Sequence, residues 1–185
     1  MMYYVITASP NSDGLTAACA KAVFEGIGAA QGRVEIINIS KHKLAPCLIC
    51  DNGWGQCRDL NACIIDDLLG EIQDKIRKSA GIILVTPVYW GQPSERMKYF
   101  LDRFRRCEAF NQAGSALKNK SVILIAAAGG SGNGTLTCLS EMENWCRHLN
   151  ADLKDRISVS RFNQISMLQA IYDAGKRLVV GEYES

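Results

Sequence analysis

The sequence lacks the features of membrane, secreted and nucleic-acid-binding proteins. No apolar run approaches the roughly 20 residues that a membrane-spanning helix needs. The opening segment MMYYVITA has neither the basic region nor the long apolar region of a signal peptide. The 21 Lys and Arg residues form no basic run and the net charge is only +2, which disfavours nucleic acid as a partner. We therefore expect a cytoplasmic protein that binds neither membranes nor nucleic acids.

The sequence also lacks several motifs of nucleotide-binding proteins and hydrolases. It has no Walker A motif and no G-x-G-x-x-G after the first predicted strand, which disfavours purine triphosphates and Rossmann-type dinucleotide binding. The two histidines, His42 and His148, are far apart and lack zinc-ligand spacing, so we expect both at the surface. Ser131 lies in G-G-S-G-N, which lacks the final Gly of a nucleophile elbow. A hydrolase is therefore not supported.

Length and composition predict one globular α/β domain over 1–185. Of the 185 residues, 48% are hydrophobic and 22% are charged, which suffices for one core. Short runs rich in Val and Ile predict buried parallel strands at 3–8, 34–39, 81–86 and 122–127, with a weaker candidate at 156–159. Predicted helices at about 16–30, 67–78, 94–106, 135–149 and 163–180 alternate with them. This alternation predicts a doubly wound sandwich with a parallel sheet covered on both faces.

The loop after the first predicted strand suits an anion. In an open parallel sheet, ligands bind outside the carboxyl ends of the strands, and residues 9–16 run from that strand straight into a helix. The hydroxyls of Ser9, Ser12 and Thr16 can donate to phosphate oxygens. Gly14 permits close approach, and the helix N-terminus adds free N–H groups. The loop has no Lys or Arg, which suits a phosphate monoester better than a triphosphate; the alternative is that Ser and Asn only cap the helix.

Two further loops follow the third and fourth predicted strands. Residues 86–93 contain Tyr89 and Trp90 between turn-forming residues, and aromatic faces suit a flat heteroaromatic ring. Residues 128–134 contain four Gly, which let the backbone approach a ligand closely. Either loop alone could be an ordinary turn. Three such loops at one edge of a sheet favour a ligand site.

These loops together resemble the flavodoxin-like NADPH-dependent FMN reductase family. The resemblance rests on S-P-x-x-x-G-x-T, on P-V-Y-W-G-Q-x-S before a helix with F-L-D-R, and on the Gly-rich loop, and it covers almost the whole chain. It implies a five-stranded sheet of order 2-1-3-4-5, non-covalent FMN, NAD(P)H as co-substrate, and a homodimer or homotetramer. By position, it implies that FMN contacts Ser9, Asn11, Ser12, Gly14, Leu15 and Thr16 at the phosphate, Pro87, Val88, Tyr89, Trp90 and Gly91 along the ring and ribityl chain, and Gly129, Gly130 and Ser131 at the far edge. Asn11 is a departure, because many members carry a basic residue there.

One long irregular stretch, 41–66, contains half of the eight cysteines. Without a signal peptide, cysteines are expected as thiols, metal ligands or redox groups rather than as a disulfide framework. The four in this stretch are Cys47, Cys50, Cys57 and Cys63, with the spacing C-x2-C-x6-C-x5-C. Four such thiolates could hold an iron–sulfur cluster or a zinc ion.

This stretch is similar to the loop of the iron–sulfur flavoproteins, a branch of the same family. In that branch, four compactly spaced Cys hold a [4Fe-4S] cluster near the flavin. Here Gly53 or Trp54 stands where the third Cys of the compact pattern would fall. The alternative is a loop shaped by free thiols.

Expectations for the other polar and cysteine residues are simpler. The remaining cysteines, Cys19, Cys107, Cys138 and Cys146, lie singly in helical stretches and are expected as small buried hydrophobes. Asp66 and Asp67 are expected to cap the following helix. The charged residues Glu95, Arg96, Lys98 and Arg103 are expected on a solvated face of helix 94–106. Arg105 and Arg106 could meet an NADPH phosphate, although nothing in the sequence selects them.

These patterns predict an FMN-dependent oxidoreductase. It would take hydride from NAD(P)H and pass electrons to a quinone, flavin, metal ion or protein acceptor. Because the flavin carries this chemistry, no side-chain acid or base is named. One alternative is an iron–sulfur flavoprotein that carries electrons between a ferredoxin-like partner and FMN, and another is a non-enzymatic flavin or thiol redox sensor.

Overall fold

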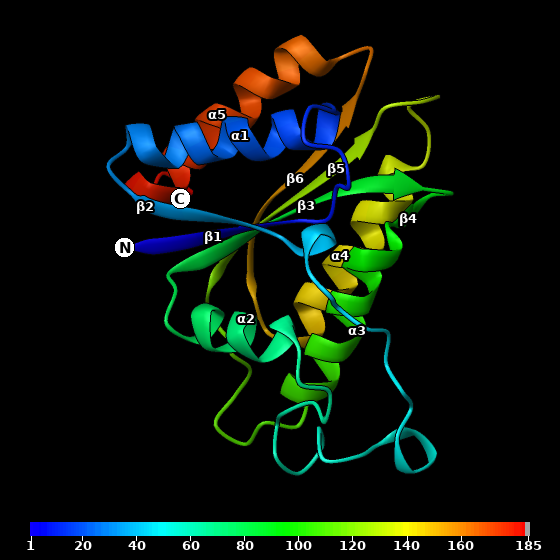
Figure 1. Cartoon of the computed structure of the whole chain (residues 1–185). Coiled ribbons are helices and arrows are strands. Elements are labelled where there is room, and N and C mark those ends of the chain that lie inside the picture. Colours follow the sequence, from blue (N-terminus) through cyan, green and yellow to red (C-terminus); the bar gives the residue numbers. More distant parts are fainter. Residues whose placement is uncertain (184–185) are drawn as a thin grey trace.

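Five parallel strands form the central sheet in the order β2-β1-β3-β5-β6 (Figure 1). The computed structural model describes residues 1–183, so residues 184 and 185 of the expected domain lie outside the described part. The strands are β1 (Met2–Thr7), β2 (Arg33–Asn38), β3 (Gly81–Tyr89), β5 (Ser121–Ala128) and β6 (Asp152–Ser160). Every neighbouring pair is parallel. Counted over these parallel strands along the chain, the predicted order 2-1-3-4-5 is confirmed.

Helices cover both faces of this sheet. On one face lie α1 (Leu15–Ala29) and α5 (Gln164–Val180), and on the other lie α2 (Leu68–Arg77), α3 (Glu95–Glu108) and α4 (Thr135–His148) (Figure 1). Along β1, Val5 belongs to the core under α1 and α5, whereas the next residue, Ile6, belongs to the opposite core. Both are fully buried, so the strands are apolar on both faces rather than alternating. Among residues 1–183, no helix is both long and apolar enough to cross a bilayer.

A β-hairpin at the end of β3 departs from the prediction. The predicted strand ends at residue 86, but β3 continues to Tyr89, turns at Trp90 and Gly91, and pairs antiparallel with β4 (Gln92–Pro93). Both turn residues have positive φ, 53° at Trp90 and 78° at Gly91, as a type I′ hairpin turn requires. A bulky residue such as Trp rarely adopts these angles. The sequence therefore carries no ordinary hairpin signal at this position.

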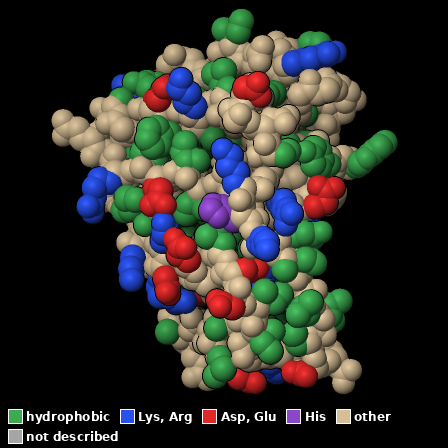
Figure 2. All heavy atoms as spheres, in the orientation of Figure 1, with side chains coloured by type: hydrophobic (Ala, Val, Ile, Leu, Met, Phe, Trp, Pro, Cys, Tyr) green, Lys and Arg blue, Asp and Glu red, His purple; other side chains and the backbone are tan. Residues whose placement is uncertain are grey.

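The segment between β2 and α2 is largely irregular, as predicted. It contains two short 3-10 turns, η1 (Ile39–Lys41) and η2 (Asp51–Gly53). In Figure 1 it runs in cyan from the sheet down along α3, and its lower part lies beside the C-terminal end of that helix. Four of its large apolar side chains are exposed, those of Leu48, Ile49, Leu60 and Ile64. Figure 2 shows hydrophobic side chains at the surface of this lower region, with charges of both signs interspersed over the face drawn.

Helices α1 and α5 approach each other closely at two glycines. A Cβ atom at Gly26 would overlap the carbonyl oxygen of Tyr172, and one at Gly175 would lie 2.7 Å from the carbonyl oxygen of Val23. A side chain at either position would force the helices apart. Gly28, on the exposed side of α1, has no atom within 4 Å of the position of a Cβ.

Gly26 and Gly28 both lie on α1, and we expect substitution by Ala to have opposite effects at the two positions. Gly26→Ala should lower the free energy of unfolding by about 1–3 kcal/mol, because the added methyl group overpacks the helix contact. Gly28→Ala should raise it by about 0.5–1 kcal/mol, because Ala favours the helix and meets open space. Urea unfolding of both variants measures the difference. Equal stabilities would contradict the close packing of α1 on α5.

Candidate functional site

The loop between β1 and α1 leaves the N-terminus of α1 open to an anion. Gly14 is the N-cap residue, so no side-chain oxygen caps the helix there, and the first turn contains no acidic residue. Ser9 Oγ donates instead to the carbonyl oxygen of Asn11 (3.0 Å), and the side chains of Asn11 and Ser12 are exposed. Capping by Ser or Asn, the alternative for this loop, is therefore not what the structure shows. The free first-turn N–H groups and the helix dipole favour a negative charge.

Buried hydroxyls tie this loop to the one that follows β3. Ser94, the N-cap residue of α3, donates from Oγ to the carbonyl oxygen of Ala8 (3.4 Å). Its backbone N–H donates to Thr86 Oγ1 (3.1 Å). Ser94 and Thr86 are both buried. The ends of β1 and β3 and the start of α3 thus hold one another in place.

The hairpin after β3 presents two aromatic side chains at this edge of the sheet. Trp90 is fully exposed and Tyr89 is 40% exposed, whereas Val88 packs against the core. Exposing a whole Trp forgoes the burial that large aromatics usually gain. The positive φ of Trp90 adds strain on the order of 1–3 kcal/mol. An exposed, strained aromatic of this kind indicates a ligand-binding role.

The Gly-rich loop after β5 packs against the tip of the hairpin. Gly134 has a φ of 82°, and a Cβ there would lie 2.7 Å from the Cα of Gly91, so only Gly fits. At Gly129 and Gly130, by contrast, a Cβ would meet nothing within 4 Å, and Ser131 is exposed. The structure thus brings the three loops with the sequence-predicted FMN residues to the ends of the adjacent strands β1, β3 and β5 (Figure 1). The open space lies at Gly129 and Gly130.

A hollow of about 610 Å³ adjoins the first loop on the side of β2. Its lining includes Ser9, Asn11 and Ser12 together with two cations, Lys21 from α1 and Lys41 from η1. Sequence reasoning missed these lysines because both lie outside the loop, Lys21 within α1 and Lys41 beyond β2. They supply positive charge beside a loop that has no basic residue of its own.

The predicted surface location of both histidines is confirmed. His42 lines the same hollow. Both His42 and His148 have exposed side chains, as predicted.

The four cysteines of the irregular segment line one cavity. Cys47, Cys50, Cys57 and Cys63 share it with three residues of α3: Arg103, Arg106 and Cys107. All eight cysteines of the chain are free thiols. Within residues 1–183, no three His, Cys, Asp or Glu side chains lie close enough together to hold a single metal ion. The arrangement therefore suits a zinc ion poorly, because zinc needs all its ligands around one atom. An iron–sulfur cluster is larger and binds one thiolate at each iron, so its four ligands can lie further apart.

Cys107 is a member of this cavity that the sequence analysis missed. It was expected only as a buried hydrophobe, and it is indeed 1% exposed. Burial, together with the charges of Cys63 and Cys57, raises the pKa of the Cys107 thiol to about 12. Cys107 therefore stays protonated, and the cavity offers four loop thiols and one inert helix thiol. Burial also raises the pKa of the remaining helix thiols, those of Cys19, Cys138 and Cys146, to about 12.

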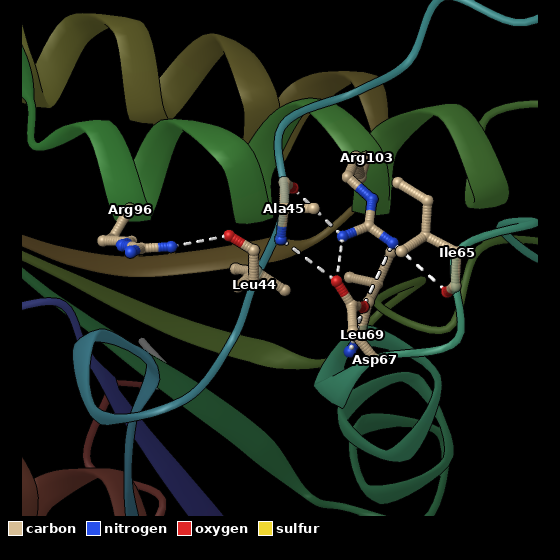
Figure 3. A network of polar contacts seen from close by, with 7 residues as sticks. All are labelled: Leu44, Ala45, Ile65, Asp67, Leu69, Arg96 and Arg103. Atoms are coloured by element: carbon tan, nitrogen blue, oxygen red, sulfur yellow. Dashed lines mark hydrogen bonds and ion pairs between the residues drawn. The ribbon is translucent and has the colours of Figure 1, made fainter.

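The prediction that Arg103 lies on a solvated face is wrong. The side chain is 1% exposed and forms a bidentate ion pair with Asp67: Nη1 donates to Oδ2 (2.6 Å) and Nη2 to Oδ1 (3.1 Å) (Figure 3). Its position, three residues after Phe100 and four before Cys107, is on the buried stripe of α3. The other three residues of that prediction, Glu95, Arg96 and Lys98, do reach solvent.

Arg103 also fastens both ends of the cysteine-bearing segment. It donates to the carbonyl oxygen of Ala45 (3.1 Å) and to that of Ile65 (3.5 Å) (Figure 3). All four loop cysteines lie between these two residues. Arg96 donates to the carbonyl oxygen of the preceding residue, Leu44 (2.8 Å). One face of α3 therefore closes the loop at its base.

The middle of the segment is held by the last turn of α3. Arg106 donates to the carbonyl oxygen of Gly53, and its guanidinium lies 4.8 Å from the ring centre of Trp54. Trp54 packs edge-to-face against Phe110, with ring centres 4.9 Å apart. The guanidinium of Arg106 is thus occupied by the loop, at the opposite end of α3 from Ser94.

Asp67 caps α2, as predicted, and binds the cysteine-bearing segment at the same time. The same prediction for Asp66 is wrong, because Asp67 alone occupies the N-cap position and Asp66 is exposed. The Oδ1 of Asp67 accepts from the N–H of Leu69 (3.1 Å), and its Oδ2 accepts from the N–H of Ala45 (3.1 Å). Burial alone would raise the pKa of this carboxyl. The hydrogen bonds from Arg103, Ala45 and Leu69 outweigh burial, so the pKa lies below its ordinary value.

The chain matches a known protein family. The sequence model of the NADPH-dependent FMN reductase family matches residues 1–161. This is most of the 185 residues, and the protein belongs to that family. The fold is similar to that of a flavodoxin from the domain Archaea, with a TM-score of 0.65 at 15% identity over 100% of both chains. The flavodoxin-like architecture is confirmed.

Two curated relatives are iron–sulfur flavoproteins. The Iron-sulfur flavoprotein of Methanosarcina thermophila is 31% identical over 130 residues, which are 69% of this chain and 64% of that protein. Iron-sulfur flavoprotein MJ1083 of Methanocaldococcus jannaschii is 29% identical over 140 residues, which are 76% of this chain and 68% of that protein. The matched stretches therefore span about two thirds of the length of these relatives.

The ion pair makes a pH-dependent prediction. Asp67→Asn keeps a capping side chain but leaves Arg103 buried without its counter-charge, so the free energy of unfolding at neutral pH should fall by about 3 kcal/mol. In the wild type, the lowered pKa of Asp67 gives stability that is present above the ordinary carboxyl pKa of about 3.9 and is lost as the pH falls through the folded value. The two proteins should therefore converge in acid. Urea unfolding at several pH values measures this.

Asp66→Asn is the matched control for this experiment, because Asp66 is the exposed neighbour of Asp67. It should change stability little at any pH. If the two variants were equally stable at neutral pH, the ion pair would not have the structural role described.

Proposed function

We propose that this protein is an FMN-dependent oxidoreductase that takes hydride from NAD(P)H and passes electrons to a quinone, flavin, metal ion or protein acceptor. The observation that carries the proposal is the meeting of an uncapped helix N-terminus with an exposed aromatic hairpin at one edge of the sheet. Membership of the NADPH-dependent FMN reductase family supports both the cofactor and the hydride donor.

The residues at this edge fit FMN. The first-turn N–H groups of α1 and the hydroxyls of Ser12 and Thr16 would hold the phosphate. Tyr89 and Trp90 would lie against the ring, and the open space at Gly129 and Gly130 would admit its far edge. Bound FMN supplies the hydride and electron chemistry. The role of this chain's own residues is to bind the cofactor and orient it.

The cysteine cavity favours a second function, electron transfer through a [4Fe-4S] cluster. Four free thiols from one loop, those of Cys47, Cys50, Cys57 and Cys63, line one cavity. Four thiolates are the ligand set of such a cluster, and the names of the two relatives support this assignment. Arg103 and Arg106 would offset part of the negative charge of the thiolates. The protein would then carry electrons between FMN and a partner such as a ferredoxin-like protein.

An oligomer, at least a homodimer, would cover the apolar side chains around the flavin edge. Five large ones are exposed there, at the end of β3 and after β3, β5 and β6: Tyr89, Trp90, Leu136, Phe162 and Ile165. Exposed apolar groups gathered in this way favour an interface. The proposed oligomer rests on this surface and on the family resemblance.

The flavin assignment predicts separate effects on binding and on stability. Trp90→Ala should weaken FMN binding by about 1 kcal/mol, or roughly fivefold in Kd, because a stacking face is lost. Ser12→Ala should weaken it by about 1 kcal/mol through a lost hydrogen bond to phosphate. Neither change should lower the thermal stability of flavin-free protein, because both side chains are exposed. Fluorescence titration of FMN into flavin-free protein measures the Kd.

Phe24→Ala is the control for this titration. Phe24 is a partly exposed aromatic on α1 that does not belong to the three loops, so its removal should leave the Kd unchanged. Wild-type affinity in the Trp90 variant would exclude the hairpin from the flavin site.

The cluster assignment predicts which thiols hold iron. Changing any one of the four cysteines of the cavity lining, for example Cys57→Ser, should remove most of the iron from protein prepared without oxygen, because the cluster loses one ligand. Cys138→Ala, in α4 and outside the cavity, should keep the iron despite some loss of stability. Iron and sulfide analysis of the purified variants measures this. Full iron content in all four single variants would refute the ligand set.

A further inference from the structure

One N–H group of Arg103 has no acceptor among the protein atoms of residues 1–183. The Nη1 and Nη2 groups donate to Asp67 and to the carbonyl oxygens of Ala45 and Ile65. The Nε atom is buried and makes no hydrogen bond within the described residues. Buried donors in folded proteins nearly always have an acceptor. The unpaired Nε–H therefore indicates that an acceptor belongs beside it.

The cavity next to Arg103 offers sulfur as that acceptor. Arg103 lines the cavity together with Cys57 and Cys63. Cys63 stands two residues before Ile65, whose carbonyl oxygen already accepts from Nη2 of Arg103 (3.5 Å). A thiolate sulfur that ligates a cluster accepts hydrogen bonds, and such bonds tune the potential of the cluster. Cys63 is thus the sulfur atom best placed to receive the Nε–H.

We infer that Arg103 is a positioning residue of the proposed cluster, which donates from Nε to the sulfur of Cys63 and raises the reduction potential. This inference rests on the cluster assignment made above. Reduction adds negative charge to the cluster and its ligands, and an N–H donor beside a ligand sulfur stabilises that added charge. Asp67 is bound to Nη1 and Nη2. The ion pair therefore holds the guanidinium in place while leaving Nε–H for the sulfur.

A purely structural role for Arg103 must be separated from this one, because Arg103 also holds both ends of the loop. Arg103→Lys keeps a positive charge beside Asp67 and removes the Nε–H. Arg105 lies on the same helix and does not belong to the cavity lining. Arg105→Lys is therefore the matched control for the same chemical change.

The test uses the full chain, prepared without oxygen and grown with ¹⁵N-labelled arginine. Pulsed EPR of the reduced cluster should detect a strong coupling to an arginine nitrogen in the wild type and in Arg105→Lys, and this coupling should be lost in Arg103→Lys. An EPR-monitored redox titration should show a more negative midpoint potential in Arg103→Lys and no shift in Arg105→Lys. Loss of loop shape alone would lower the iron content without shifting the potential of the cluster that remains.

The possible results distinguish failure of the Arg103 hydrogen bond from failure of the cluster assignment. A wild-type cluster without arginine-nitrogen coupling overturns the inference, and this measurement needs no variant to fold. An Arg103→Lys protein with the potential of the wild type overturns it as well, and both results leave the cluster assignment standing. Wild-type protein that holds no iron overturns the cluster and the inference together.

Discussion

The buried ion pair between Arg103 and Asp67 is the interaction on which the cysteine cavity depends. Two charges are removed from water at this point, which a fold tolerates only when both are paired and their remaining donors and acceptors are hydrogen-bonded. The carboxylate meets this condition by capping α2 and binding the N–H of Ala45. The guanidinium meets it at Nη1 and Nη2, which reach the carbonyls of Ala45 and Ile65, whereas its Nε–H has no acceptor within residues 1–183. All four loop cysteines lie between Ala45 and Ile65. The same pairing that satisfies the buried charges therefore brings the thiols to one place.

Helix α3 connects this cavity to the candidate FMN site at the carboxyl edge of the sheet. It begins at Ser94, whose hydroxyl and N–H join the ends of β1 and β3, and its last two turns carry Arg103 and Arg106. Arg103 lies nine positions after Ser94, which is a rise of about 14 Å at 1.5 Å per residue. The side chains of Phe100 and Phe104 are buried along one face of the helix and anchor it to the core. The helix is therefore a rigid spacer. The two candidate sites are thus built on opposite ends of one element, and a shift of that helix would move both.

Much of the fold could be predicted because the strands buried on both faces have continuous runs of Val and Ile. The prediction for β6 was shorter, 156–159 against Asp152–Ser160, because this edge strand begins with the polar residues Asp152, Lys154 and Asp155. The hairpin after β3 was missed because Trp90 is not a residue that usually turns a chain. Arg103 was misplaced because its charge was given more weight than its spacing from Phe100 and Cys107, and its partner, Asp67, is a tertiary contact that no local pattern reveals. The FMN and cluster residues stay predictions, since loop position and residue type limit the ligand without determining it.

We propose that one chain holds a flavin at the carboxyl edge of the sheet and a four-iron cluster in the cysteine cavity. The most direct test is a combined visible spectrum, FMN assay and iron and sulfide analysis of the wild-type protein purified without oxygen. The account predicts one FMN and four irons per chain, with flavin absorbance on a broad iron–sulfur background. Yellow protein without iron would contradict the cluster, and colourless protein that takes up no added FMN would contradict the account as a whole.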